Sequence, residues 1–156
     1  GKIEAVSEEV VIVDFLHEIK DELTPTLKEG QHIEVACSPD VGSAISDSRI
    51  LRNVLFNLIS NASKYSDPGK TITLGCVREL GSMIFSVRDQ GQGIPQEDQK
   101  HLFERFFRAK NAVNIQGSGL GLNIVRRYLD LLGGEIWFTS QYGFGSTFSF
   151  SIPAGN

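Results

Sequence analysis

Residues 55–65 of the chain read Leu55-Phe56-Asn57-Leu58-Ile59-Ser60-Asn61-Ala62-Ser63-Lys64-Tyr65. On a helix, the four-residue spacing of Asn57 and Asn61 places both carboxamides on one face, about 6 Å apart along the axis. A carboxamide oxygen can bind a hard cation such as Mg²⁺, its NH₂ can donate to phosphate, and Lys64 adds a charge about one turn further on. With three glycine-rich turns downstream, this stretch predicts a helix at the edge of a nucleoside triphosphate site.

The same helix carries a broad apolar face. Asp47 or Ser48 can cap its N-terminus, and the pattern runs to about Tyr65. The apolar face consists of Ile50, Leu51, Val54, Leu55, Leu58, Ile59 and Ala62. Because Asn53, Asn57 and Asn61 follow the edge of this face, we expect their amides at the boundary of the core.

The remaining patterns alternate between strands and helices. We expect strands over 10–13, 32–36, 71–78, 83–89, 135–140 and 146–152, and further helices over 14–28, 95–103 and 120–132. The last helix has Ile124, Val125, Tyr128, Leu129 and Leu132 on its predicted inner face. This order predicts an α+β fold, a two-layer α/β sandwich with a mixed, mostly antiparallel sheet of about five strands covered on one face by about three helices.

Composition limits the classes of function. The 156 residues, 40% of them hydrophobic, suit one domain over 1–156, with an ordered core over about 9–153. The net charge of −4, without a basic stretch, argues against a surface for nucleic acid but allows a local cationic pocket. The sequence shows neither a long apolar run nor a signal-peptide layout, so we expect a cytoplasmic domain, which can also be the cytoplasmic end of a membrane-anchored parent. Cys37 and Cys76 lie in apolar alternating stretches, which favours buried reduced thiols.

The stretch Asp89-Gln90-Gly91-Gln92-Gly93-Ile94-Pro95 ends one predicted strand. Met83, Phe85, Val87 and Asp89 share a strand face, so the carboxylate points the same way as the buried side chains. An inward carboxylate needs a donor, and the exocyclic amine of adenine is one. The two glycines would let a planar base approach the backbone. A plain strand end followed by a turn is the alternative interpretation.

Two more glycine-rich stretches follow. Gly117-Ser118-Gly119-Leu120-Gly121-Leu122 leads into a helix, whose free N–H groups and dipole can hold phosphate oxygens. It lacks the Lys-Ser/Thr ending of a P-loop and the last glycine of a dinucleotide fingerprint, so it matches neither motif. Gly143-Phe144-Gly145-Ser146-Thr147 reads as a hairpin turn that supports packing near the pocket.

Five motifs occur in a fixed order along the chain. They are the asparagine helix, the Asp-x-Gly-x-Gly strand end, Phe103-Glu104-Arg105-Phe106-Phe107-Arg108, the Gly-Ser-Gly-Leu-Gly-Leu stretch and the final Gly-x-Gly-x-Thr. This order resembles the N box, first glycine box, F box, and second and third glycine boxes of sensor histidine kinases. The resemblance covers about 9–153 and implies their catalytic and ATP-binding domain, with the Bergerat fold shared with gyrase, Hsp90 and MutL.

The resemblance implies roles for the matching residues. Asn61 would bind the Mg²⁺ that bridges the phosphates of ATP, Asn57 and Lys64 would contact phosphate, and Tyr65 would pack against adenine. Asp89 would accept a hydrogen bond from the adenine amine. The base pocket would be completed by Gly91, Gly93 and Ile94, and the phosphate side, at the end of a lid over 96–118, by Gly117, Ser118, Gly119, Leu120 and Gly121. Arg108 would reach the γ-phosphate.

One position favours phosphotransfer over hydrolysis. Gyrase-like ATPases have a glutamate four residues before the metal-binding asparagine, where this chain has Asn57, and an amide cannot act as a general base. The resemblance therefore implies transfer of the γ-phosphate to a histidine brought from elsewhere. A related ATPase, an anti-sigma serine kinase and a catalytically silent nucleotide-binding module remain alternatives.

The phosphoacceptor histidine is expected on another domain. His17-Glu18-Ile19-Lys20 imitates the acceptor box of the family, but the sequence after it already supplies the first helix and strands of this domain. We therefore expect His17 to be a partly exposed helix residue. A dimerisation and phosphoacceptor domain would precede the chain in a homodimeric parent, a response regulator would be the other partner, and the isolated domain would be monomeric.

Overall fold

The computed structural model describes residues 4–99 and 122–155. The strands are β1 (Glu8–Val11), β2 (His32–Cys37), β3 (Ser43–Ser46), β4 (Thr71–Glu79), β5 (Ser82–Arg88), β6 (Glu135–Gln141) and β7 (Gly145–Pro153). The helices are α1 (Ile12–Leu23), the 3₁₀ helix η1 (Thr24–Thr26), α2 (Ser48–Lys64), α3 (Gln96–Gln99) and α4 (Leu122–Leu132). None of the helices within 4–99 and 122–155 is long and apolar enough to cross a membrane.

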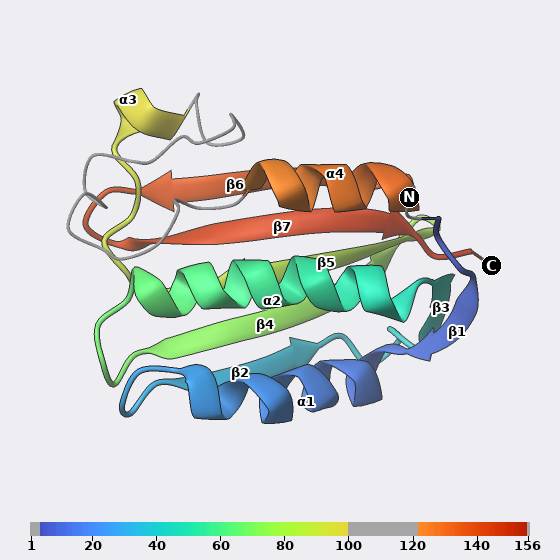
Figure 1. Cartoon of the computed structure of the whole chain (residues 1–156), viewed down its shortest axis with the longest axis horizontal. Coiled ribbons are helices and arrows are strands. Elements are labelled where there is room, and N and C mark those ends of the chain that lie inside the picture. The colour runs from blue at the N-terminus through green and yellow to red at the C-terminus, as the bar shows by residue number, and fades with distance from the viewer. Residues whose placement is uncertain (1–3, 100–121, 156) are drawn as a thin grey trace.

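These elements form two layers. The main sheet has five strands in the order β2-β4-β5-β7-β6, in which β2 and β4 are parallel and the other pairs antiparallel. Helices α1, α2 and α4 lie side by side on one face of this sheet (Figure 1). The predicted α+β sandwich with a mixed sheet of five strands under three helices is therefore confirmed.

A second, two-stranded sheet was not predicted. Strand β1 pairs antiparallel with β3, and Val10 and Ala44, which lie opposite each other, are both buried. The stretch that forms β3, Ser-Ala-Ile-Ser, has little strand propensity of its own, so its structure depends on pairing with β1. Helix α1 begins at Ile12 rather than Asp14, and its α-helical hydrogen bonding stops at Leu23 because Pro25 has no N–H to donate.

The predicted inner faces of the strands and of α2 are confirmed. Met83, Phe85 and Val87 of β5 are at most 2% exposed, and the apolar face of α2 is buried throughout. Two other predictions were partly wrong. Ile124 is 46% exposed because α4 buries only the stripe that includes Val125 and Leu129, and Cys37 is only half-buried because β2 is an edge strand.

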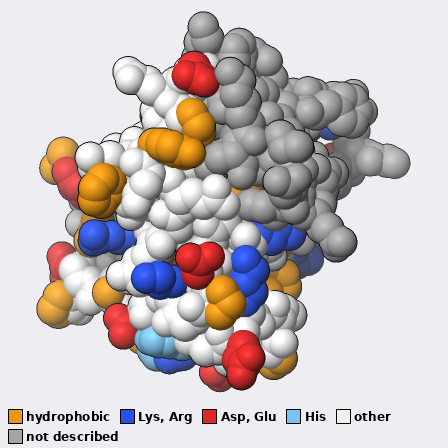
Figure 2. Space-filling view, turned by 90° about the vertical axis from the view of Figure 1, so that its left-hand side faces the viewer, with side chains coloured by type: hydrophobic (Ala, Val, Ile, Leu, Met, Phe, Trp, Pro, Cys, Tyr) orange, Lys and Arg blue, Asp and Glu red, His pale blue; other side chains and the backbone are white. Residues whose placement is uncertain are grey.

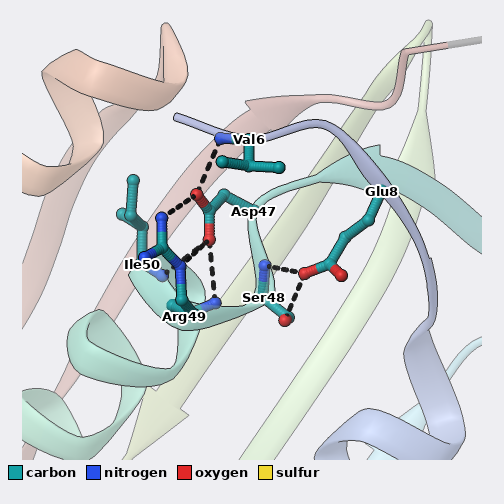
Figure 3. A network of polar contacts seen from close by, with 6 residues as sticks. All are labelled: Val6, Glu8, Asp47, Ser48, Arg49 and Ile50. Atoms are coloured by element: carbon teal, nitrogen blue, oxygen red, sulfur yellow. Dashed lines mark hydrogen bonds and ion pairs between the residues drawn. The ribbon is translucent and has the colours of Figure 1, made fainter. Parts of the chain in front are cut away.

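The N-terminus of α2 is capped as the sequence predicts. The Asp47 side chain accepts hydrogen bonds from the backbone N–H groups of Arg49 (2.9 Å) and Ile50 (3.3 Å). Its second oxygen accepts from the N–H of Val6 at 2.8 Å, and Glu8 accepts from the N–H and hydroxyl of Ser48 (Figure 3). The cap therefore also ties the segment that leads into β1 to the start of α2.

Candidate functional site: a pocket at the C-terminal end of α2

A pocket opens between the last turns of α2 and the sheet. It is lined by Leu58, Asn61, Ala62, Tyr65, Val87, Asp89, Gly93, Ile94, Ser146 and Phe148. One wall comes from α2, a second from the end of β5 and the loop after it, and a third from the start of β7. Mostly apolar walls with a few placed polar groups suit a flat organic ring that carries a hydrogen-bonding edge.

Asp89 is the buried carboxylate of this pocket. It follows β5 directly and is 8% exposed, which confirms the inward direction that strand parity predicts. Its Oδ1 accepts hydrogen bonds from the backbone N–H groups of Gly91 (2.9 Å) and Ser146 (3.2 Å). Burial raises the pKa of the Asp89 carboxyl, and these two donors offset only part of that rise. The carboxyl is therefore a fixed acceptor in a poorly solvated site.

The asparagines of α2 approach the pocket from the helix side. Asn61 is 8% exposed and lines the pocket, and its Nδ2 donates to Oδ1 of Asn57 at 3.4 Å. Asn57 is half-buried one turn earlier, and Lys64 is exposed. Tyr65, the C-cap residue of α2, is half-buried in the pocket wall. The structure thus brings Asn61 and Tyr65 together with Asp89, while Asn57 and Lys64 lie on the adjoining surface of the helix.

Gly91 and Gly93 are required by the backbone of the protein itself. A Cβ on Gly91 would lie 2.3 Å from the carbonyl oxygen of Tyr65, and one on Gly93 would lie 2.3 Å from that of Gln141. Gly93 also has a φ of +72°, which favours glycine. The close approach that the sequence analysis assigned to a base is here made by neighbouring segments. Contact of these glycines with a ligand stays a prediction, and of the two only Gly93 lines the pocket.

The turn between β6 and β7 packs against the backbone of Asp89 and of the loop that follows it. A Cβ on Gly145 would meet the carbonyl oxygen of Asp89 at 2.4 Å, and the N–H of Gly143 donates to the carbonyl of Gln92. The predicted role of this hairpin in packing near the pocket is therefore confirmed. Because Gly145 has no side chain, the hairpin can lie directly against the strand end that carries the carboxylate.

Two serines belong to the site and were missed from the sequence. Ser146 is buried, donates its N–H to Asp89, and its hydroxyl lies 2.8 Å from that of Ser140. Ser140 Oγ in turn accepts from the N–H of Ile94 at 2.8 Å. Parity along β7 could have found Ser146, because it precedes the inward Phe148 by two residues.

Several predicted site residues belong to the stretch between Gln99 and Leu122. Arg108, Gly117, Ser118, Gly119, Leu120 and Gly121 lie outside the described residues, as does the predicted lid beyond Gln99. The described part of α4 starts at Leu122, which is 1% exposed in the core. The predicted phosphate contacts of the second glycine stretch therefore stay predictions.

The end of the molecule that contains the pocket is not uniformly acidic. Figure 2 shows several Lys and Arg side chains on this face, interspersed with Asp and Glu side chains and below a group of hydrophobic side chains. The net charge of −4 therefore does not exclude cationic side chains at this end of the molecule, as the sequence analysis allowed.

The histidines offer no competing site in the described ranges. His17 is exposed on α1, as predicted, and His32 lies 3.0 Å from the hydroxyl of Thr71. Residues 4–99 and 122–155 contain no group of three or more His, Cys, Asp and Glu side chains that could hold a metal ion.

Residues 46–156 match the family described as histidine kinase-, DNA gyrase B- and HSP90-like ATPases, HATPase_c. The chain belongs to this family. The matched range contains α2, the pocket and the two glycine-rich turns beside it. The family description names ATPases, which identifies ATP as the ligand of this class of domain.

Similar proteins are sensor kinases. The adaptive-response sensory kinase SasA of Synechococcus elongatus is 33% identical over 147 residues, which cover 93% of this chain and 38% of that protein. The circadian input-output histidine kinase CikA of the same organism is 41% identical over 110 residues, 69% of this chain and 15% of that protein. This chain thus spans only a minor part of the length of these relatives.

Solved structures show the same fold. The nucleotide-free catalytic domain of histidine kinase ThkA superposes with a TM-score of 0.83 at 26% identity, over 96% of this chain and 97% of that one. Full-length ShkA in complex with AMPPNP superposes with a TM-score of 0.86 at 28% identity, over 100% of this chain and 33% of that one. The HATPase_c domain described here therefore corresponds to the catalytic part of such kinases.

Proposed function

We propose that this chain is the ATP–Mg²⁺-binding catalytic domain of a sensor histidine kinase, which transfers the γ-phosphate of ATP to a histidine on a separate domain. One observation carries the proposal: the buried Asp89 carboxyl faces a mostly apolar pocket beside the Asn61 amide, in a chain of the HATPase_c family. The relatives named as sensory and histidine kinases support the reaction class.

Adenine fits the pocket by its chemistry. Within the described residues, both hydrogen bonds to the Asp89 side chain reach Oδ1, so we assign Oδ2 to the exocyclic amine of adenine. Tyr65, Ile94 and Phe148 would contact the faces and edges of the ring. A carboxyl that accepts from the base gives specificity for an amino-purine.

The phosphates would extend along α2. Asn61 would place its amide oxygen on Mg²⁺, and Asn57 with Lys64 would contact phosphate oxygens. When bound, Mg²⁺ neutralises charge on the phosphates. Arg108 and the stretch 117–121 would complete this side of the site. These assignments rest on residue chemistry and on the family motifs.

Asn57 favours transfer to a protein acceptor over hydrolysis. An amide at this place cannot take a proton from water, so the domain would position ATP and stabilise its charge without activating a water molecule. The acceptor histidine would lie on the dimerisation domain of a homodimeric parent, and the phosphoryl group would pass from there to a response regulator. We further propose that residues 1–156 form one domain, monomeric on its own.

Trans-phosphorylation tests the proposal. The chain is incubated with radiolabelled ATP, Mg²⁺ and the histidine-bearing domain of its parent, and acid-labile, base-stable phosphate on that domain is measured. We expect label with the native chain and strongly reduced label with Asn61→Asp or Asp89→Asn. A native chain that binds ATP but leaves the acceptor unlabelled, or that turns over ATP rapidly by itself, would contradict histidine phosphotransfer.

A further inference from the structure

The last turn of α2 is held by the loop over 28–31, far away in the sequence. Gln31 is 6% exposed, and its Nε2 lies within hydrogen-bond distance of three backbone carbonyls, those of Ser63 (3.1 Å), Ser66 (3.1 Å) and Asp67 (3.2 Å). Its Oε1 accepts from the hydroxyl of Ser63 at 2.6 Å and from the N–H of Lys28 at 3.0 Å. One buried amide therefore binds both the end of the helix and the turn that follows it.

Lys28 adds a charge to the same contact. Its Nζ donates to the carbonyl oxygens of Lys64 and Ser66, both at 2.9 Å. The last carbonyls of a helix have no partner within the helix, and a cation there also interacts favourably with the helix dipole. Gln31 and Lys28 thus satisfy much of the C-terminal end of α2.

The opposite side of this turn meets the pocket. The carbonyl of Tyr65 accepts from the N–H of Gln92 at 3.3 Å, and Gly91 packs against that same carbonyl. Asp89 lies two residues before Gly91 and is hydrogen-bonded to it. The turn at the end of α2 is therefore fixed between the loop over 28–31 on one side and the strand end that carries the carboxylate on the other.

We infer that Gln31 is a positioning residue for nucleotide binding, because it fixes the last turn of α2 and so sets Asn61 and Tyr65 opposite Asp89. Gln31 does not line the pocket and acts only through this turn. The inference rests on the proposed function. A glutamine is suited to the task because it donates to carbonyls and accepts from a hydroxyl with one uncharged group.

The test compares three variants of the chain. Gln31→Glu keeps the size of the side chain but removes both N–H donors and sets a negative charge against three carbonyls. Lys28→Met removes the hydrogen bonds from Nζ to the carbonyls of Lys64 and Ser66. Lys28 is exposed, so this substitution does not put folding at risk. Asp47→Ala is the control, because it removes a cap at the other end of the same helix. The dissociation constant of Mg–ATP is measured by calorimetry well below the unfolding temperature, and amide exchange without nucleotide is measured at Gln92.

We expect Gln31→Glu to weaken Mg–ATP binding at least about tenfold, in the range found for residues that orient a binding group. Lys28→Met should weaken it about threefold, and Asp47→Ala by less than about twofold although it lowers the melting temperature. Exchange at Gln92 should accelerate only in the Gln31 and Lys28 variants. If Gln31→Glu does not fold, the Mg–ATP affinity of Lys28→Met and its amide exchange at Gln92 test the positioning role instead.

The inference and the proposed function fail in different ways. Native affinity and native exchange at Gln92 in a folded Gln31→Glu chain would overturn the positioning role. An equal loss of affinity in Asp47→Ala would also overturn it, because general destabilisation would then explain the effect. A native chain that fails to bind Mg–ATP would contradict the proposed function instead, while the exchange measurement would still decide whether Gln31 fixes the turn.

Discussion

The two ends of α2 are held by opposite chemistry. At the N-terminus, the carboxylates of Asp47 and Glu8 accept from free N–H groups (Figure 3). At the C-terminus, the amide of Gln31 and the ammonium group of Lys28 donate to carbonyls. Both ends thus satisfy the groups that a helix leaves unpaired. Only the second end adjoins the pocket, so the first should affect stability and the second should affect ligand binding.

The strongest test of this difference makes the same substitution at two buried aspartates, Asp47 at the N-terminus of α2 and Asp89 in the pocket beside its C-terminus. Asp89→Asn turns an NH₂ toward the adenine amine, and the loss of a charge-assisted hydrogen bond should weaken ATP binding about 10- to 100-fold. Asp47→Asn, which affects only the cap, should leave the affinity unchanged. Calorimetric titration of both folded variants with Mg–ATP measures the difference. Equal affinities in the native chain and Asp89→Asn would refute the assigned role of this carboxylate.

The asparagine stripe permits a second comparison along the helix. Asn61→Ala should weaken ATP binding about tenfold in the presence of Mg²⁺, because a proposed metal ligand is lost, and much less in its absence. Asn53→Ala is the matched control, since Asn53 is exposed on the same helix. Titrations with and without Mg²⁺ give the four affinities. A loss that is the same with and without the metal would argue that Asn61 acts on the nucleotide alone.

A third measurement concerns stability rather than binding. Asp47→Ala removes the N-cap of α2 and should cost about 1 kcal/mol of unfolding free energy, or about 2–4 °C of melting temperature. Glu8→Gln, which changes an exposed side chain, should have a smaller effect in the same direction. Thermal unfolding of the ligand-free chains checks both values. An unchanged melting temperature in Asp47→Ala would show that the cap is not needed for the helix.

The two aspartates should also respond differently to pH. Burial alone would raise the pKa of Asp47, but hydrogen bonds from Arg49, Val6 and Ile50 hold it below the ordinary value of 3.8. Its contribution to stability is therefore complete above the unfolded-state value and is lost as pH falls through the folded-state value. Asp89 has a raised pKa, so its ionisation in the folded chain costs some stability as pH rises.

The pH dependence of binding should follow Asp89. As pH falls through its raised pKa, Asp89 takes up a proton and ATP affinity should decrease a few-fold, while Asp47 is still ionised and the fold intact. Calorimetry across mildly acidic pH measures this decrease, and Asp89→Asn corrects for titration of ATP itself. Parallel pH profiles for the native chain and the variant would exclude Asp89 as the titrating group.

Features that follow from a periodic pattern of residues, or from a single residue type, could be predicted from the sequence. Parity placed Asp89 inward, and the helical period placed Asn61 at the core boundary. Asp47 or Ser48 was expected as the cap from residue type, and the structure has Asp47. The predicted sandwich followed from the order of such elements. These features are local, so neighbouring residues contain enough information to predict them.

Features that depend on distant contacts could not be predicted. Gln31 lies in a loop without periodicity, and its partners at the end of α2 are more than 30 residues away. Gly91 and Gly93 were expected to make room for a base, but the structure shows a different requirement, the close carbonyls of Tyr65 and Gln141. Strand β3 pairs with β1 and also donates from the N–H of Ile45 to the carbonyl of Ala154, both distant in the sequence. The exposure of Ile124 reflects how α4 lies on the sheet.

The most direct test of the account is a crystal structure of this chain with Mg²⁺ and a nonhydrolysable ATP analogue. We predict that Oδ2 of Asp89 lies within hydrogen-bond distance of the adenine amine, with the amide oxygen of Asn61 bound to Mg²⁺. An analogue bound elsewhere, or a pocket between α2 and β7 filled by protein side chains, would contradict it.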